Sequence, residues 1–158
     1  MARPRKSNFP GARSSSHQND SFFSNLYDRF AQAEAWHIFD DVIPALEFLG
    51  SRGLKLGIVS NWDERLRPLL HQLNLDRFFQ TIVISCEVGQ YKPAPTIFKR
   101  AAESLASPPA SILHVGDSQI MDVNGATTAG FQSLLLNRES IPRPGQLNSL
   151  NQLHELFR

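Results

Sequence analysis

The sequence contains one cysteine, Cys86, among its 158 residues, and this scarcity excludes two kinds of stabilising site. A single thiol cannot form an internal disulfide, and it cannot supply the set of cysteine ligands that structural zinc sites use. This composition is typical of proteins from a reducing compartment, so we expect a cytoplasmic location. We interpret Cys86 as structural, because the neighbouring Glu87 has the wrong charge to stabilise a thiolate.

Long apolar runs and an excess of either charge are also missing. No apolar run reaches the roughly 18 residues that a membrane-spanning helix requires. The 16 lysines and arginines nearly balance the 15 aspartates and glutamates. Binding to an anionic partner by net charge requires a basic excess, so we expect neither nucleic acid nor a membrane as a partner.

The first 20 residues lack both an apolar stretch and any acidic residue before Asp20. We therefore expect no secretory signal in this segment and a disordered tail over 1–20. The segment carries Arg3, Arg5, Lys6 and Arg13, a balance that weakly resembles an organelle transit peptide. Organellar targeting is therefore the alternative to a cytoplasmic location, although the prolines of the segment disfavour the amphipathic helix of such peptides.

The rest of the chain alternates between short apolar runs and stretches with helical spacing of apolar residues. The runs predict strands at about 54–60, 81–85, 111–117 and 133–137, and the spacing predicts helices at about 21–35, 42–51, 63–73, 95–106, 121–129 and 147–157. Asp40 or Asp41 is a candidate cap for the second helix, and Pro68 predicts that the third is kinked or starts late. Short strands that are apolar on both faces indicate an α/β fold with a parallel sheet and helices on both sides.

Ligands of such sheets bind at the carboxyl ends of the strands, and Ser60 and Asn61 follow the first predicted strand directly. A hydroxyl and an amide beside a helix start can donate hydrogen bonds to a phosphate. Both residue types are also common in ordinary turns, which is the alternative interpretation.

Lys92 lies between Gly89 and Pro93 in the loop before the fourth predicted helix. A residue that precedes proline is restricted to extended conformations, so the loop is expected to hold the lysine in one direction. A fixed ammonium group is suited to neutralising phosphate charge, whereas an ordinary loop lysine is simply solvated.

Two carboxylates, Asp117 and Asp122, flank the turn from the third predicted strand into the helix that follows. Carboxylate oxygens near a phosphate suit magnesium, which takes one or two carboxylates together with phosphate and water. Alternatively, Asp122 merely stabilises the helix N-terminus. Gly125 and Ala126 are small enough to let this helix pack closely on the sheet. His114, within the preceding strand, is interpreted as a histidine of the core or its edge.

Ser60, Asn61, Lys92, Asp117 and Asp122, with their flanking sequences, resemble the second, third and fourth motifs of the haloacid-dehalogenase-like hydrolases. The resemblance extends from about Trp36 to Asn137 and implies a Rossmann-like parallel sheet with flanking helices. It further implies magnesium-dependent hydrolysis of phosphate esters, with a small phosphorylated metabolite as substrate. By this resemblance Ser60, Asn61 and Lys92 bind phosphate, Lys92 also supports the catalytic nucleophile, Asp117 ligates Mg²⁺, and Asp122 is a ligand or its supporting partner.

The family's first motif, an Asp-x-Asp pair on a central strand whose first aspartate is the nucleophile, has no counterpart here. None of the aspartates before Ser60 follows an apolar strand: Asp20, Asp28, Asp40 and Asp41. The resemblance therefore implies a core at 40–158 that lacks its central nucleophile strand, preceded by a remnant of a helical cap at 21–39. The strands around Ile58 and Leu113 would then each have an unpaired edge.

Three functions fit these features. The first is a shortened, inactive member of a phosphohydrolase family, a pseudoenzyme that binds magnesium weakly without the missing aspartate. The second is a non-catalytic module that binds phosphate or pairs with another protein through an exposed sheet edge. The third, a receiver-type signalling domain, is disfavoured because Asp117 lies too late in the chain for its phosphorylated aspartate.

Overall fold

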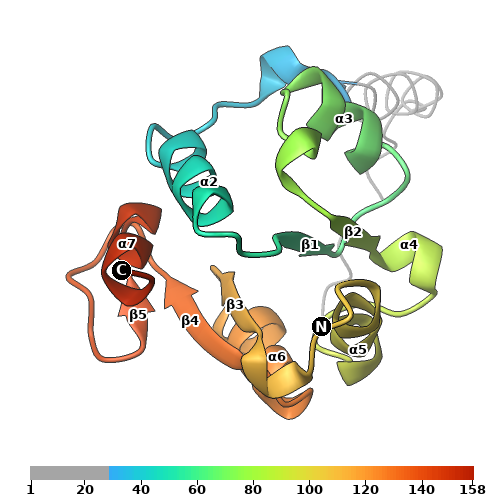
Figure 1. Cartoon of the computed structure of the whole chain (residues 1–158). Helices are drawn as coiled ribbons and strands as arrows, with labels where there is room; N and C mark the ends of the chain where they lie inside the picture. The colour runs from blue at the N-terminus through green and yellow to red at the C-terminus, as the bar shows by residue number, and fades with distance from the viewer. Residues whose placement is uncertain (1–28) are drawn as a thin grey trace, which may run out of the picture.

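The computed structural model describes residues 29–158, which form an α/β unit (Figure 1). Its strands are β1 (Gly57–Ser60), β2 (Thr81–Ile84), β3 (Leu113–Gly116), β4 (Gln132–Leu136) and β5 (Gln146–Leu147). Its α-helices are α2 (Val42–Ser51), α3 (Leu66–Gln72), α4 (Ser85–Val88), α5 (Pro95–Ser104), α6 (Gly125–Thr128) and α7 (Leu153–Leu156). The predicted tail and most of the predicted helix at 21–35 lie outside the described residues, which begin shortly before a 3₁₀ turn at Ala33–Ala35.

All the strand pairs are parallel, which confirms the predicted fold class. β1 pairs with β2, with Gly57 opposite Thr81. β3 pairs with β4, with Leu113 opposite Gln132, and β4 pairs with the short β5. Helices lie on both sides of the strands, with α2 on one side and α5 and α6 on the other (Figure 1).

The strands form two sheets instead of one. Within residues 29–158, β1 pairs only with β2 and β3 pairs only with β4, and no ladder joins β1 to β3. A cavity of about 570 Å³ separates them and is lined by Gly57, Ile58 and Val59 on one side and residues 113–116 on the other. The break therefore falls at the position where the family resemblance places the missing strand.

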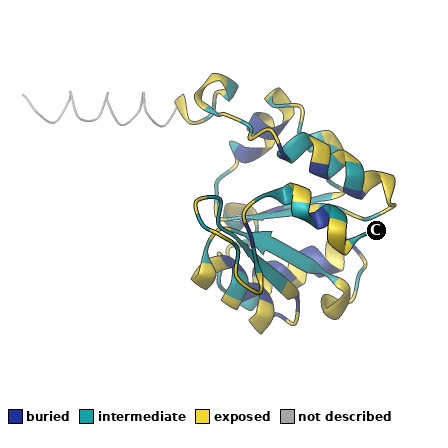
Figure 2. Cartoon of the chain, turned by 90° about the vertical axis from the view of Figure 1, so that its left-hand side faces the viewer, coloured by how far each residue is buried: buried dark blue, intermediate teal, exposed yellow. Residues whose placement is uncertain are grey.

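Burial along the strands agrees with this break. Val83 and Ile84 of β2 are 4% and 0% exposed, whereas no residue of β1 or β3 is fully buried. Figure 2 shows the strands mainly in the colour of intermediate burial. The central strands of a helix-covered parallel sheet are normally its most buried ones. The cavity therefore leaves β1 and β3 more exposed than they would be in a continuous sheet.

The larger core cluster joins α5 to β2 and to the segment around α6. Pro95 occupies the first turn of α5, where a backbone N–H would have no hydrogen-bond partner within the helix, so proline costs nothing there. Apolar residues then recur at helical spacing and pack against β2 and Phe131: Ile97, Phe98, Ala101 and Ala102. A second cluster, around Leu49, Leu147 and Leu153, packs α2 against α7 and β5.

The predicted helices agree with the structure where local sequence decides the outcome. Helix α2 has the predicted bounds, and α3 begins at Leu66 instead of near residue 63. This late start places Pro68 in the first turn, where the absent N–H breaks no helical hydrogen bond. The last predicted helix is shorter than expected, because β5 and a 3₁₀ turn occupy its first half.

Asp41 holds the C-terminal segment against α2 instead of capping that helix. It occupies the N-cap position, but its side chain makes no capping hydrogen bond. Its Oδ2 accepts hydrogen bonds from Arg138 Nη1, Ser149 Oγ and the Leu150 backbone N–H, each at 2.8 Å. Burial raises the pKa of Asp41, but these donors outweigh it and lower the pKa to about 2.

Over residues 29–158, no helix is long and apolar enough to cross a bilayer.

Candidate functional site

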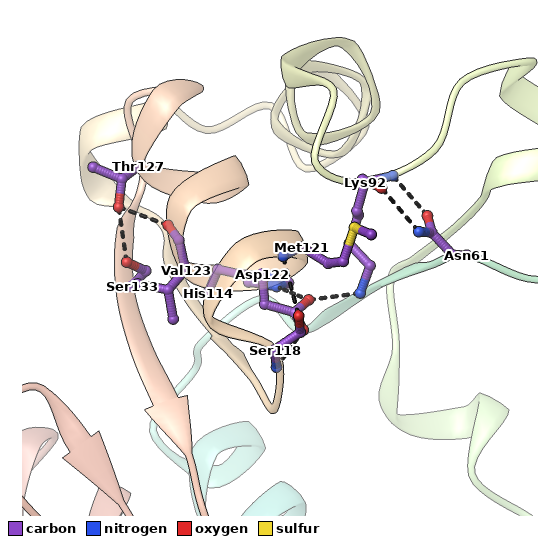
Figure 3. A network of polar contacts seen from close by, with 9 residues as sticks. All are labelled: Asn61, Lys92, His114, Ser118, Met121, Asp122, Val123, Thr127 and Ser133. Carbon is purple, nitrogen blue, oxygen red and sulfur yellow. Dashed lines mark hydrogen bonds and ion pairs between the residues drawn. The ribbon is translucent and has the colours of Figure 1, made fainter.

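The side chain of Asn61, just after β1, holds the loop that carries Lys92. Asn61 Nδ2 donates to the carbonyl oxygen of Lys92 at 3.0 Å, and the backbone N–H of Lys92 donates to Asn61 Oδ1 at 2.6 Å (Figure 3). Both polar groups of the Lys92 backbone are therefore satisfied by one side chain. This fixes the start of the lysine side chain relative to the end of β1.

The ammonium group of Lys92 reaches from this loop to Asp122. Its Nζ lies 2.6 Å from Asp122 Oδ1, and the two side chains are 14% and 4% exposed. His114 Nε2 lies 2.9 Å from the same oxygen, and the Ser118 backbone N–H donates to Oδ2 at 3.1 Å. Asp122 thus ties β3 and the turn after it to the Lys92 loop (Figure 3).

These contacts keep Asp122 ionised. Burial acts to raise its pKa, but the hydrogen bonds from His114 and Lys92, with the charge of Lys92, hold the pKa of Asp122 well below its ordinary value. At neutral pH the group is therefore a carboxylate whose charge the lysine offsets.

Two features of the turn after β3 place Asp122 in this position. Ser118 Oγ accepts a hydrogen bond from the Met121 backbone N–H at 3.1 Å and so caps the π-helical turn at Gln119–Asn124. The turn packs its aspartate onto Gly116: a Cβ at Gly116 would lie 2.2 Å from Asp122 Cγ. Only glycine permits this approach.

Gly125 plays the same part on the opposite side of the turn. A Cβ there would lie 2.8 Å from Phe98 Cε2 and 3.0 Å from Pro93 Cα. The start of α6 therefore packs directly on the Lys92–Pro93 loop, with Ala126 fully buried beside it. This agrees with the close packing that the two small residues indicate in the sequence.

The remaining predicted site residues lie at the same end of the strands. Asp117 follows β3, is exposed, and lines the cavity between β1 and β3 together with Lys92 and Asp122. Ser60 is the last residue of β1 and is half-buried. The structure thus gathers Lys92, Asp117 and Asp122 around one cavity and places Ser60 and Asn61 at the neighbouring strand end.

The described residues do not form a complete magnesium site. No three histidine, cysteine or acidic side chains are grouped to hold a metal ion between residues 29 and 158. Asp122 Oδ1 already faces two nitrogens, and Oδ2 accepts a backbone hydrogen bond. Among the residues that the structure describes, Asp117 is then the one carboxylate at the cavity that is open to solvent, while magnesium prefers several oxygen ligands.

His114 belongs to the site as well as to the core edge. Its ring packs edge-on against Phe98, with centroids 5.1 Å apart, while Nε2 contacts Asp122. The sequence interpretation as a core histidine missed this second contact. The alternation of a strand carries the signal: His114 and Gly116 are two residues apart, so they lie on the same face, onto which Asp122 packs.

Comparisons with known proteins identify relatives of this chain by sequence and by fold. A family model described as haloacid dehalogenase-like hydrolase matches residues 10–130. Haloacid dehalogenase-like hydrolase domain-containing protein 3 of Danio rerio is 36% identical over 141 residues, which cover 85% of this chain and 58% of that protein. Glyceraldehyde 3-phosphate phosphatase of Methanopyrus kandleri is 37% identical over 106 residues, covering 63% and 43%.

Solved structures agree with the sequence relatives. A HAD phosphatase from Thermococcus onnurineus superposes with a TM-score of 0.76 at 29% identity, covering 85% of this chain and 63% of that one. The chain spans 58% of the Danio rerio protein, so it corresponds to little more than half of that relative. With the family model covering most of the chain and the strand-end motifs in place, this chain belongs to the haloacid dehalogenase-like hydrolase family.

Proposed function

We propose that this chain carries the phosphate-binding part of a phosphate-ester hydrolase site and does not turn over by itself. The observation that carries the proposal is the Lys92–Asp122 ion pair at the carboxyl end of the cavity between β1 and β3. An ammonium group has three donors, and Asp122 Oδ1 takes one of them. The other two are available to phosphate oxygens, which accept strong charge-assisted hydrogen bonds.

The neighbouring residues support this role in different ways. The hydroxyl of Ser60, at the end of β1, is a further donor for a phosphate oxygen. Asn61 acts as a positioning residue, because both of its amide atoms hold the Lys92 backbone. Asp122 orients the lysine, so that little side-chain entropy remains to be lost when phosphate binds.

Hydrolysis by the family's route requires a carboxylate that attacks phosphorus. Along the described part of the chain, the acidic residues that line the cavity are Asp117 and Asp122. Asp122 is ion-paired and accepts three hydrogen bonds, and Asp117 directly follows β3 instead of ending a strand between β1 and β3. Neither is placed as the nucleophile strand would place its aspartate, so the chain is proposed to bind phosphate without cleaving its esters.

Asp117 is the residue that we propose as a magnesium ligand. A magnesium ion would neutralise phosphate charge in a hydrolase site, but its other ligands must come from groups beyond the described carboxylates. A small phosphorylated metabolite is the proposed substrate class of the parent activity, in line with the name of the Methanopyrus kandleri relative.

Titration with inorganic phosphate by isothermal calorimetry tests the binding role. We expect Lys92→Met to weaken phosphate affinity by about tenfold or more, since one charge-assisted contact contributes about 1.5–3 kcal/mol. Lys99→Met, at an exposed position of α5, is the matched control and should retain affinity. Equal affinity of wild type and Lys92→Met would contradict the proposal.

Hydrolysis of p-nitrophenyl phosphate with Mg²⁺ tests the inactivity. We expect the rate of the wild-type chain to equal that of Asp117→Ala. Turnover by the wild type that Asp117→Ala abolishes would show a working site and overturn this part of the proposal.

A further inference from the structure

The cavity between β1 and β3 is one part of a longer groove. A second cavity, of about 610 Å³, is lined by Leu54, Leu56, Leu113 and Val115 and by residues of α7. Leu56, Leu113 and Val115 also line the cavity at the carboxyl end. The two therefore join into one groove, the inter-sheet groove, which follows β1 and β3 from their amino ends to Lys92.

The two strands that form the walls of the inter-sheet groove, β1 and β3, run in the same direction. Asn61 follows β1 and contacts Lys92, which contacts Asp122 just after β3, so both carboxyl ends meet at the lysine. In the described chain each of the two strands pairs on its outer side only. The inner edges consequently present two rows of N–H and C=O groups to the groove.

The side chains along the groove are mainly apolar on both faces of the gap. Leu46 and Leu49 of α2 line it on one side, and Ala101 and Leu105 at α5 line it on the other. An aliphatic ligand would match these side chains but would leave the two backbone edges without partners. An extended polypeptide matches both, because its backbone pairs sideways while its side chains alternate between the two faces.

We propose that the inter-sheet groove binds an extended, apolar segment of a second polypeptide, which inserts parallel to β1 and β3 and joins the two sheets into one. The occupant carries apolar side chains on both faces and turns polar where it reaches the ammonium group of Lys92. The binding mode is β-strand addition at an internal gap, with hydrogen-bond ladders on both sides of the added strand.

Fluorescence anisotropy with a labelled synthetic peptide tests this proposal. The probe has two lysines for solubility, five alternating valines and leucines, and a final aspartate–glycine–aspartate. Its control has the same sequence with alternate backbone nitrogens of the apolar run methylated, which keeps the apolar surface but removes ladder donors. We expect the unmodified peptide to bind, and the methylated one to bind at least about tenfold more weakly. Equal affinity of the two, or no binding of the unmodified peptide up to about 1 mM, would overturn the proposal.

Variants of the protein locate the binding site. Val115→Lys places a charge in the groove wall and should abolish peptide binding, whereas Thr96→Lys, on the exposed side of α5, should retain it. Circular dichroism shows whether Val115→Lys is folded; if it is not, the two peptides on the wild-type chain still decide the outcome. Retained binding by a folded Val115→Lys contradicts the groove as the site.

Sedimentation and hydrolysis separate this proposal from its alternatives. A wild-type dimer that binds no peptide, and that Val115→Lys converts to a monomer, would show that a second copy fills the groove and would overturn the proposal. Of these measurements, only the hydrolysis assay depends on the proposed function. In it, p-nitrophenyl phosphate and Mg²⁺ are added together with the aspartate peptide, or with a control peptide in which asparagine replaces both aspartates. Peptide binding without turnover supports strand addition and contradicts the parent hydrolase activity, while turnover with the aspartate peptide alone supports both.

Discussion

Asn61 and Lys92 are 31 residues apart in the chain, and one amide side chain satisfies both backbone polar groups of the lysine. The contact joins the end of β1 to the loop before α5. It determines where the Lys92 side chain begins, and the ion pair with Asp122 determines where it ends. The ammonium position therefore depends on two strands that belong to different sheets.

Removal of the amide should loosen the lysine without removing it. We expect Asn61→Ala to weaken phosphate affinity several-fold and to lower the free energy of unfolding by about 1–2 kcal/mol, because two hydrogen bonds are lost at an exposed position. Calorimetric phosphate titration and urea unfolding measure the two effects. Gln90→Ala, exposed in the same loop, is the control and should leave both unchanged. Unaltered phosphate affinity in Asn61→Ala would refute the positioning role.

The absence of a Cβ at Gly116 is a steric requirement of the site. Gly116→Ala would place a methyl group 2.2 Å from Asp122 Cγ, so the carboxylate or the π-helical turn must move. We expect a loss of about 1–3 kcal/mol in unfolding free energy, measured by urea denaturation. Gly50→Ala is the matched control: apart from its chain neighbours and the backbone of its own helix, no described atom lies within 4 Å of its added Cβ, and alanine should stabilise α2 by up to about 1 kcal/mol. Equal effects of the two substitutions would show that the close approach is not a constraint.

The sequence indicates the parts of this fold that local chemistry determines. The bounds of α2 and the late start of α3 follow from apolar spacing and from Pro68, and the structure has both. Three predicted site residues, Lys92, Asp117 and Asp122, line one cavity, because strand ends of a parallel sheet meet at one edge.

Contacts between distant segments were not predictable from the sequence in the same way. The partners of Asp41 lie 97 to 109 residues further along the chain, so the sequence suggested only its local role as a helix cap. The strand β5 has two residues, too few to show any periodicity. The engagement of both amide atoms of Asn61 depends on the placement of a loop that no pattern in the sequence specifies.

The lowered pKa of Asp41 predicts a stability that declines in acid. A carboxyl group with a folded pKa of about 2 and an ordinary value of 3.8 stabilises the fold above about pH 4 and loses that contribution as the pH falls toward 2. We expect Asp41→Asn to lower the unfolding free energy by on the order of 2 kcal/mol at pH 7, and by about half as much at pH 3. Urea unfolding at the two pH values measures the difference, with the exposed Asp40→Asn as control. A deficit of the same size at both pH values would contradict the ionic origin of this anchor.

The buried ion pair of Lys92 and Asp122 should show strong energetic coupling. Lys92→Met leaves a carboxylate that is 4% exposed without its lysine, and we expect it to lower the unfolding free energy by about 2–3 kcal/mol, with His114 still in contact. In the double variant with Asp122→Asn no buried charge is left uncompensated, so part of that loss should be recovered and the cycle should give a coupling of about 1 kcal/mol or more.

A second cycle on the exposed pair Arg100–Glu103 provides the reference for that coupling. Its atoms are 3.6 Å apart and its side chains are 62% and 68% exposed, so water screens the interaction and the coupling should be close to zero. Urea unfolding of the seven proteins of the two cycles, which share the wild type, gives both values. If the two cycles yield the same coupling, Lys92 is not held in place by Asp122. The phosphate-binding proposal would then lose its premise, which is that the ammonium group is fixed.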